Sequence, residues 1–217
     1  HAGGMLSYGV PPYRLPRDIV EREYQRILDL GVELRLRTRV GIDVTMRELR
    51  DQYDAVLIAI GMQLGRALPI EGVDLEGVLH GVNILYEVSM GHQVNLGKKV
   101  IVIGGGNVAF DVARTCVRQG VGDLTMVILE SREELPADDI EYDEGREEGI
   151  KVLLRRGPKR ILGQGGRVVG LETLDVEYVF DAERRFNPKF YEGTEKQLEA
   201  DTVILTIGQS TDCLLYT

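Results

Sequence analysis

The sequence predicts an α/β fold with a Rossmann-like three-layer βαβ domain, and three adjacent features support this. An apolar run rich in β-branched residues covers residues 100–103. Three glycines follow it directly at residues 104–106, and apolar residues then recur at helical spacing from Val108 to Val117. A strand, a glycine turn and a helix in this order form the phosphate-binding start of a βαβ unit.

The glycine spacing is G-x-G-x-x-A, with Gly104, Gly106 and Ala109 at the three fixed positions. Gly104 permits the tight turn off the strand, and the absence of a Cβ at Gly106 lets a pyrophosphate approach the backbone. Ala109 is small enough for the helix to pack closely on the sheet. The N–H groups at the helix start favour an anion. We therefore expect a dinucleotide site at Gly104, Gly105, Gly106, Asn107 and Val108.

A second strand is predicted over residues 124–129, and Glu130 follows it. A Rossmann unit places an acid about 20 residues beyond the glycine motif, where it binds the adenosine ribose diol. Glu130 is therefore the predicted ribose ligand, with Ser131 and Arg132 beside it. The alternative, a doubly wound domain whose glycine turn binds nothing, is disfavoured by the fully apolar strand before the turn.

The bulk composition excludes several classes of protein. The net charge of −9 and a pI of about 5.0 argue against nucleic-acid binding. No apolar run approaches the roughly 20 residues that span a bilayer, and no signal peptide is visible. Cys116 and Cys213 form no CxxC pair, so we expect no redox disulfide, iron–sulfur cluster or other metal site here. These features favour the cytoplasm.

The first part of the chain combines helical, strand-like and irregular segments. We expect irregular chain over residues 3–16, a helix over 17–30 and a short strand over 32–36. Thr45 and Glu48 form a capping box before another short helix. The sequence further predicts a buried strand over 53–60 that ends at Gly61, a linker over 62–80, and a short helix over 82–90.

The part that follows Glu130 begins with nine acids and one base between Glu133 and Glu148. A solvated helical face is the favoured interpretation, and a protein-docking patch is the alternative. Next come a third strand over 150–154, a β-meander over 159–179, a polar loop over 181–193 and a final buried strand over 201–208.

Two segments of the chain are near repeats of each other. Residues 54–61 read DAVLIAIG and residues 201–208 read DTVILTIG. One precedes the glycine motif and the other follows it by about a hundred residues. The pair suggests two related nucleotide-binding folds, one inserted in the other.

Four segments of the chain are distinctive in combination, namely GGMLSYGVPPYRLP, VIVIGGGNVAFDVAR, SREELPA and DTVILTIGQSTD. Together they resemble the small subunit of glutamate synthase and related flavoproteins with two dinucleotide-binding domains. The resemblance implies a partial FAD-binding domain and linker at 1–96, an NAD(P)H-binding domain at 97–210, and the start of a return to the FAD domain at 211–217. It also implies cofactor contacts at Gly61, Ile207 and Gly208, FAD in the full-length protein, and an electron-accepting partner subunit or iron–sulfur domain.

The chain departs from that family in two respects. The first G-x-G-x-x-G and the later Gly-Asp motif, which hold FAD in the family, are not among these 217 residues. Members that use NADPH resemble R-R-S-R-E-E-M-P-A where this chain has Leu129-Glu130-Ser131-Arg132. A carboxylate suits a ribose diol and repels a phosphate, so NAD is preferred, while Arg132 leaves NADP open.

The predicted reaction is hydride transfer from NAD(P)H to flavin, which is the cofactors' own chemistry. No catalytic side chain is therefore expected, and the three histidines are interpreted as surface residues. The alternative function is a non-catalytic nucleotide-binding or assembly module of a larger oxidoreductase complex.

Overall fold

A computed structural model describes residues 1–212, so residues 213–217 of the predicted return segment, Cys213 among them, lie outside the described residues. The chain forms two compact units. One combines His1–Leu64 with the residues from Gln209, and the other is Gly65–Gly208. The second unit is thus inserted in the chain of the first. We describe each unit separately.

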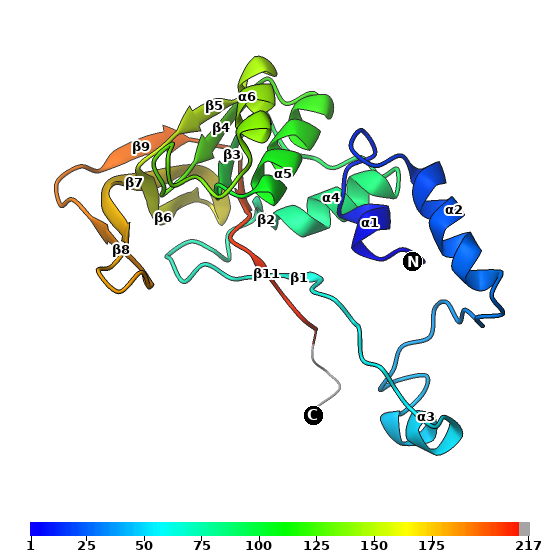
Figure 1. Cartoon of the computed structure of the whole chain (residues 1–217). Coiled ribbons are helices and arrows are strands. Elements are labelled where there is room, and N and C mark those ends of the chain that lie inside the picture. The colour runs from blue at the N-terminus through cyan, green and yellow to red at the C-terminus, as the bar shows by residue number, and fades with distance from the viewer. Residues whose placement is uncertain (213–217) are drawn as a thin grey trace. The chain divides into compact units, whose positions relative to one another are not determined.

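The Gly65–Gly208 unit is built on a five-stranded parallel sheet (Figure 1). Its strands, in spatial order, are β2 (Val78–His80), β10 (Thr202–Leu205), β3 (Lys99–Ile103), β4 (Asp123–Val127) and β5 (Lys151–Leu153). Every neighbouring pair is parallel. The strand before the glycine motif is therefore the central one, as expected for the first strand of a doubly wound sheet.

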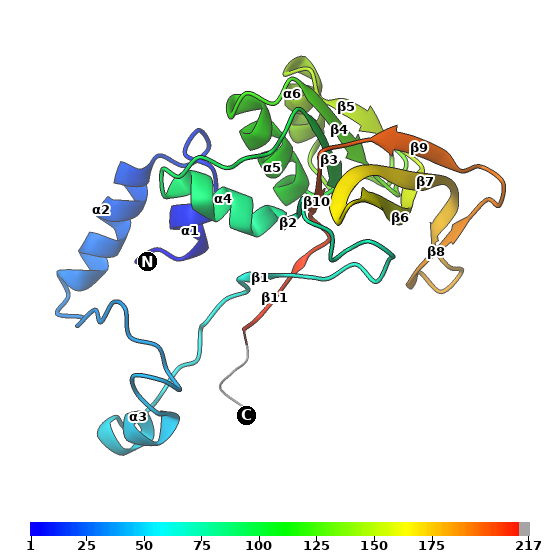
Figure 2. The same ribbon diagram turned by 180° about the vertical axis from the view of Figure 1, so that it is seen from behind.

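Helices cover one face of this sheet, and an antiparallel sheet covers the other (Figures 1 and 2). The helices are α4 (Gly81–Ser89), α5 (Asn107–Arg118) and α6 (Asp139–Glu147). The antiparallel strands are β6 (Arg156–Gln164), β7 (Arg167–Phe180), β8 (Phe186–Phe190) and β9 (Lys196–Glu199), and β7 pairs with each of the others. The predicted three-layer α/β fold with a β-meander is confirmed.

Both faces of the parallel sheet are buried because side chains alternate along each strand. On β3, Val100 and Val102 join the core under the helices, together with Phe110 of α5. Ile101 and Ile103 join a second core against the antiparallel sheet. This two-sided burial explains why β3 is apolar at all four positions after Lys99.

The acidic stretch after β4 is only partly a solvated face. Glu141, Glu144 and Glu148 all form ion pairs with Arg114 of α5, at 3.3, 2.6 and 2.7 Å. The side chains of Arg114 and Glu141 are 7% and 8% exposed. The interpretation as a solvated helical face therefore holds only in part, because Arg114 on the facing helix pairs with three of the acids and Glu141 is buried with it.

The unit that begins at His1 contains α1 (Met5–Tyr8), α2 (Arg17–Leu28) and α3 (Met46–Gln52). The capping box of Thr45 and Glu48 is confirmed. A pair of two-residue strands, β1 (Leu64–Gly65) and β11 (Gln209–Ser210), forms a separate small sheet. Val20 is the one residue of His1–Leu64 among the buried hydrophobic residues of the described chain.

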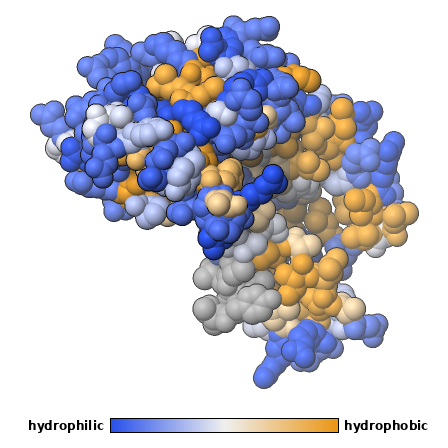
Figure 3. Space-filling model, turned by 60° about the vertical axis from the view of Figure 1, so that its left-hand side comes forward, coloured by the Kyte–Doolittle hydropathy of each residue, from blue (hydrophilic) through white to orange (hydrophobic). Residues whose placement is uncertain are grey.

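Two strands predicted in this unit were wrong. Within residues 1–212, neither 32–36 nor 53–60 belongs to a strand. Leu57 is 91% exposed, and Figure 3 shows apolar residues at the surface in the lower part of the view, where α3 and its neighbours lie. A strand needs hydrogen-bonding partners on a neighbouring strand, and the described residues supply none to these segments.

Three further expectations differ from the structure. The predicted linker over 62–80 contains β2, which is an edge strand of the parallel sheet. The predicted polar loop over 181–193 contains β8, which pairs with β7. The chain divides after Leu64, so residues 65–96 lie in the unit of the glycine turn, whereas the domain boundary was expected at residue 97.

Candidate functional site

The glycine turn connects β3 to α5 at the carboxyl edge of the parallel sheet. Gly104 has a φ of +135°, a region that strongly favours glycine. A Cβ at Gly104 would lie 2.6 Å from the carbonyl oxygen of Thr206, just beyond β10. The Gly104 N–H donates to the Val127 carbonyl at 3.1 Å. The turn is therefore held between β10 and β4, and no larger residue fits at Gly104.

The two following glycines have different surroundings. A Cβ at Gly105 would lie 2.7 Å from Ile128 and 3.1 Å from Leu135, so this side of the turn is covered by protein. Around Gly106 nothing lies within 4 Å of the Cβ position. Gly106 is also the N-cap of α5 and provides no side-chain cap. The open face of the turn thus coincides with the helix N-terminus, where an anion is stabilised.

Asn107 ties the turn to the loop before α6. Its side-chain amide donates to Asp138 at 2.9 Å, and its side-chain oxygen accepts from the Asp138 N–H at 2.9 Å. The Ala137 N–H donates to the Gly105 carbonyl at 3.1 Å. Because the side chain is engaged in this way, Asn107 can offer a ligand only its backbone, as the motif predicts. Val108 is partly exposed on the first turn of α5.

Glu130 lies beside the turn, so the structure brings together the two predicted parts of the site. Its Oε2 atom lies 3.4 Å from the Cβ position of Gly105. Burial raises the pKa of Glu130, the neighbouring Glu134 raises it further, and a backbone hydrogen bond opposes the shift. The carboxylate is thus a half-buried hydrogen-bond acceptor next to the glycines.

The other predicted residues occupy different places. The backbone N–H of Ser131 donates to Glu134 at 3.2 Å, and Arg132 pairs with Asp139 at 2.6 Å. Ile207 packs against the core between the two sheets, and Gly208 has a φ of +104°. Gly61 belongs to the other unit of the chain and not to the unit that contains the glycine turn.

Several residues that shape the site were not among those predicted. Thr206 donates through its hydroxyl and its N–H to the Ile103 carbonyl, at 2.6 and 2.9 Å, and so fixes the end of β10 against β3. Asp138 and Arg155 lie at the loops beyond β4 and β5. Thr206 belongs to the repeated segment over residues 201–208, so the repeat could have indicated its role. Asp138 and Arg155 take their places through tertiary contacts that no local sequence pattern reveals.

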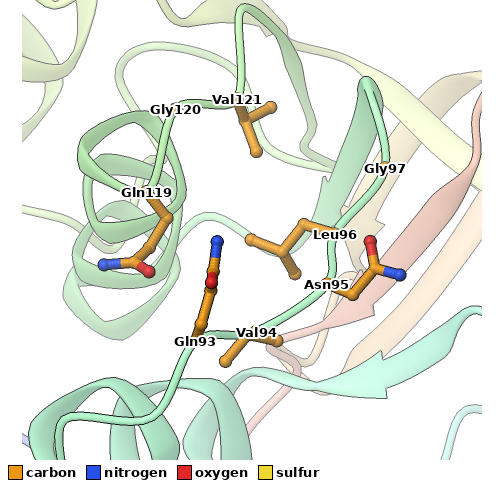
Figure 4. Close-up of a pocket in the computed structure, with 8 residues that line it drawn as sticks. All are labelled: Gln93, Val94, Asn95, Leu96, Gly97, Gln119, Gly120 and Val121. Atoms are coloured by element: carbon orange, nitrogen blue, oxygen red, sulfur yellow. The ribbon is translucent and has the colours of Figure 1, made fainter.

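One pocket of about 450 Å³ lies away from this site (Figure 4). It is lined by residues 93–97, before β3, and by residues 119–121, between α5 and β4. Both segments lead into the amino ends of parallel strands, whereas ligands of open α/β sheets bind outside the carboxyl ends. The pocket is therefore not the predicted dinucleotide site.

The described residues were also compared with the requirements of a reactive thiol, a metal site and a membrane-spanning helix. Cys116 is fully buried in the core, and burial raises its pKa to about 12, so the thiol is unreactive. Across residues 1–212, no three His, Cys, Asp or Glu side chains are grouped as a metal site would require. No helix in that range has the length and apolar character needed to cross a membrane.

A comparison with protein families shows the family to which this chain belongs. The family described as pyridine nucleotide-disulphide oxidoreductase matches residues 2–216. The chain belongs to this family. Its relatives include the "NADPH-Fe(3+) oxidoreductase subunit beta" of Geobacter sulfurreducens, 38% identical over 98% of this chain and 32% of the relative. The "Glutamate synthase [NADPH] small chain" of Azospirillum brasilense is 32% identical over 95% of this chain and 45% of the relative. The chain thus spans a third to a half of these relatives.

Solved structures show the same fold. FprA of Mycobacterium tuberculosis, in its complex with NADPH, superposes with a TM-score of 0.77 at 19% identity, covering 95% of this chain and 61% of FprA. Thioredoxin reductase of T. acidophilum gives a TM-score of 0.64 at 19% identity, covering 96% and 66%. The resemblance to the glutamate synthase small subunit and its flavoprotein relatives is confirmed at the level of the family.

Proposed function

We propose that the chain is the NAD(P)H-binding part of a flavin-dependent oxidoreductase that passes electrons to a partner subunit or an iron–sulfur domain. One observation carries the proposal. The turn is open at Gly106, at the N-terminus of α5, and the Glu130 carboxylate lies beside it. The family and the names of its longer relatives support the proposal. The small number of cysteines favours the cytoplasm.

The glycine turn and Glu130 bind different parts of the dinucleotide. The backbone N–H groups of residues 106–108 bind the pyrophosphate, and Glu130 accepts hydrogen bonds from the adenosine ribose diol. Ile207 and Gly208, which follow Thr206 just beyond β10, would contact the nicotinamide half. When bound, reduced nicotinamide supplies a hydride, and the protein supplies orientation. No acid or base from this chain is required.

FAD does not fit the described residues by themselves. The His1–Leu64 unit buries one large hydrophobic side chain, and its residues up to 63 form no strand. An apolar cradle with convergent polar groups, which a cofactor of this size needs, is not formed there by the described residues. We therefore assign no step to FAD within this chain. The relatives are two to three times as long as this chain, and we place the flavin in a protein of that length.

The preferred dinucleotide is NAD. Glu130 occupies the position of an arginine in the motif of NADPH-using members, and a carboxylate there pairs with a diol and repels a phosphate. The relatives named above are called NADPH enzymes, so this preference separates the chain from its relatives. A comparison of NADH and NADPH binding by the same preparation tests it. Tighter binding of NADPH would contradict it.

Gly106→Val provides a direct test of dinucleotide binding. Gly106 has a φ of −86° and open space around its Cβ position, so valine adds bulk only where the pyrophosphate approaches. We expect at least a roughly tenfold weaker NADH affinity, measured by quenching of nicotinamide fluorescence. Gly122→Val is the matched control because Gly122 is also open and lacks a positive φ. Equal affinities in the two variants would refute the site.

One observation favours the alternative of a non-catalytic nucleotide-binding module, namely the missing FAD cradle. Absorbance of the purified chain separates the two functions. A yellow protein that NADH bleaches supports the reductase, whereas a colourless protein that binds NADH shows that this chain contributes binding alone.

A further inference from the structure

Asn107 and Asp138 form a clamp between the glycine turn and the start of α6. The Asn107 side-chain amide donates to Oδ2 of Asp138 at 2.9 Å, and the Asp138 N–H donates to Oδ1 of Asn107 at 2.9 Å. Beside them the Ala137 N–H donates to the Gly105 carbonyl at 3.1 Å. These hydrogen bonds join the turn to a segment that lies 31 residues further along the chain.

The bond at Gly105 determines which way the next backbone donor points. The carbonyl of Gly105 and the N–H of Gly106 belong to one planar trans peptide, so they point in opposite directions. Because the Gly105 carbonyl faces Ala137, the Gly106 N–H faces away from the loop before α6. The clamp thus keeps this N–H turned outward at the start of α5, where an anion is stabilised.

Asp138 serves the turn and not its own helix. It is the N-cap of α6, a position where aspartate commonly accepts from the N–H groups of the first helical turn. Asp138 makes no such side-chain bond, and its carboxylate accepts from Asn107 instead. The side chains of Asn107 and Asp138 therefore satisfy each other, and neither caps the N-terminus of α5.

The clamp is anchored through α6. Arg114 of α5 pairs with Glu141 of α6 at 3.3 Å and with Glu148, the C-cap of α6, at 2.7 Å. These ion pairs fix α6 to α5, so residues 137–138 are held at the start of a rigid element. A site on such an element keeps its geometry more precisely than a site on a loop.

We propose that Asn107 and Asp138 are positioning residues for the pyrophosphate of the dinucleotide. They hold the turn in the conformation that binds the anion, so less has to be ordered on binding. This inference rests on the proposed function and extends it to two side chains. The carboxylate of Asp138 repels an anion by its charge, so its contribution to binding comes from the hydrogen bond to Asn107.

The test compares Asn107→Ala, Asp138→Ala, the double alanine variant and Asp138→Asn in the 217-residue chain. Dissociation constants are measured by nicotinamide fluorescence for NADH and by competition for ADP. Asn107→Ala removes both side-chain bonds, and we expect about fivefold weaker binding of NADH and ADP. The double variant should match Asn107→Ala, because the two side chains act through each other. Both residues are exposed and alanine favours helices, so the variants should fold.

Asp138→Asn separates the hydrogen bond from the charge. Asparagine keeps an oxygen that accepts from Asn107 and removes the negative charge, so this variant should bind NADH at least as tightly as the unmodified chain. Asp138→Ala removes the same charge together with the acceptor, and we expect it to bind about threefold more weakly than Asp138→Asn. Equal affinities of these two variants would overturn the proposal.

Two controls exclude a general disturbance of the chain. Asp143→Ala removes one charge from an exposed position of α6, five residues beyond Asp138, and a loss equal to that of Asp138→Ala would overturn the proposal. Adenosine has no phosphate, so its affinity, measured by NMR, should be unchanged in every variant; a loss as large as that for ADP would also overturn it. Failure of the unmodified chain to bind NADH refutes the proposed function itself, whereas an unchanged affinity in Asn107→Ala refutes this inference alone.

Discussion

Residues 54–61 and residues 201–208 have similar sequences, identical at four of eight positions, and different structures. In the later segment β10 pairs with β2 on one side and β3 on the other, and Val203 and Ile204 are fully buried. In the earlier segment Leu57 is 91% exposed, and among residues 1–212 no strand pairs with residues 54–60. The difference lies in the neighbours that each segment has, since the side chains are nearly equivalent.

This comparison shows that an apolar, β-branched pattern makes a segment suitable for a buried strand but does not make the segment form one. The pattern describes a chain that fits a buried, pleated surface, and it does not by itself create that surface. At β10 the flanking strands take up the backbone hydrogen bonds, while helices and the antiparallel sheet cover the two faces. A similar sequence without neighbouring strands has no ladder to take up its backbone hydrogen bonds.

The largest expected effect comes from truncating equivalent side chains in the two segments. Ile204→Ala removes a fully buried side chain from the core under the helices, so we expect a loss of about 3 kcal/mol in the free energy of unfolding. Leu57→Ala should change it by less than about 0.5 kcal/mol, because the side chain contacts water. Urea denaturation followed by circular dichroism measures both.

A cost for Leu57→Ala close to that of Ile204→Ala would break the comparison, because it would mean that residues 54–60 are packed in solution. The companion substitution Ile58→Ala, at another exposed position of the same segment, then shows whether the whole segment is covered.

A smaller effect is expected at the glycines that end the two segments. Gly208 has a φ of +104° and Gly61 has a φ of +71°, so alanine is strained at both. We expect Gly208→Ala to cost about 1–2 kcal/mol of unfolding free energy, since β10 and the bond from the Arg66 N–H hold its backbone. Gly61→Ala should cost less than about 0.5 kcal/mol, because the backbone before it belongs to no strand and can relax. Equal losses would indicate that residues 54–61 are as firmly held as β10.

The elements predicted correctly are those whose signals are local. The apolar run before Gly104, the helical spacing from Val108 and the Thr45–Glu48 capping box each act within a few residues, and the structure contains all three elements. The placement of Glu130 beside Gly105 was also expected, because the motif fixes the order of strand, turn, helix and strand.

The elements that sequence reasoning missed depend on partners far along the chain. β2 has three residues and no clear periodicity, and it exists as a strand because β10 lies beside it. Arg114 draws Glu141 inward from a helix that reads as solvated, and no spacing within that helix reveals the arginine. The holding of Arg155 by Glu134 likewise joins residues that follow different strands.

The smallest predicted difference concerns Asp201 and Asp54, the first residues of the two segments. The Asp201 carboxylate accepts the N–H groups of Lys98 and Lys99 at 2.7 and 2.9 Å, and it thereby joins the start of β10 to the start of β3. Asp54 is exposed and makes neither bond. We expect Asp201→Asn to cost about 0.5–1 kcal/mol at neutral pH, at the low end for charged hydrogen bonds because the group is exposed. Asp54→Asn should be neutral in the same urea measurement.

The dependence of this difference on pH identifies its cause. The two backbone hydrogen bonds, that from Lys99 first, hold the pKa of Asp201 below its usual value of 3.8. A carboxylate whose pKa is lower in the folded state stabilises the fold above the unfolded pKa, and this contribution is lost as the pH falls through the folded value. The difference in unfolding free energy between Asp201→Asn and the unmodified chain should thus have its full size above about pH 5. It should disappear as the pH falls below the usual pKa. A gap that persists in acid would assign the loss to packing at Gly97 instead, where a Cβ would meet Asp201 at 2.5 Å.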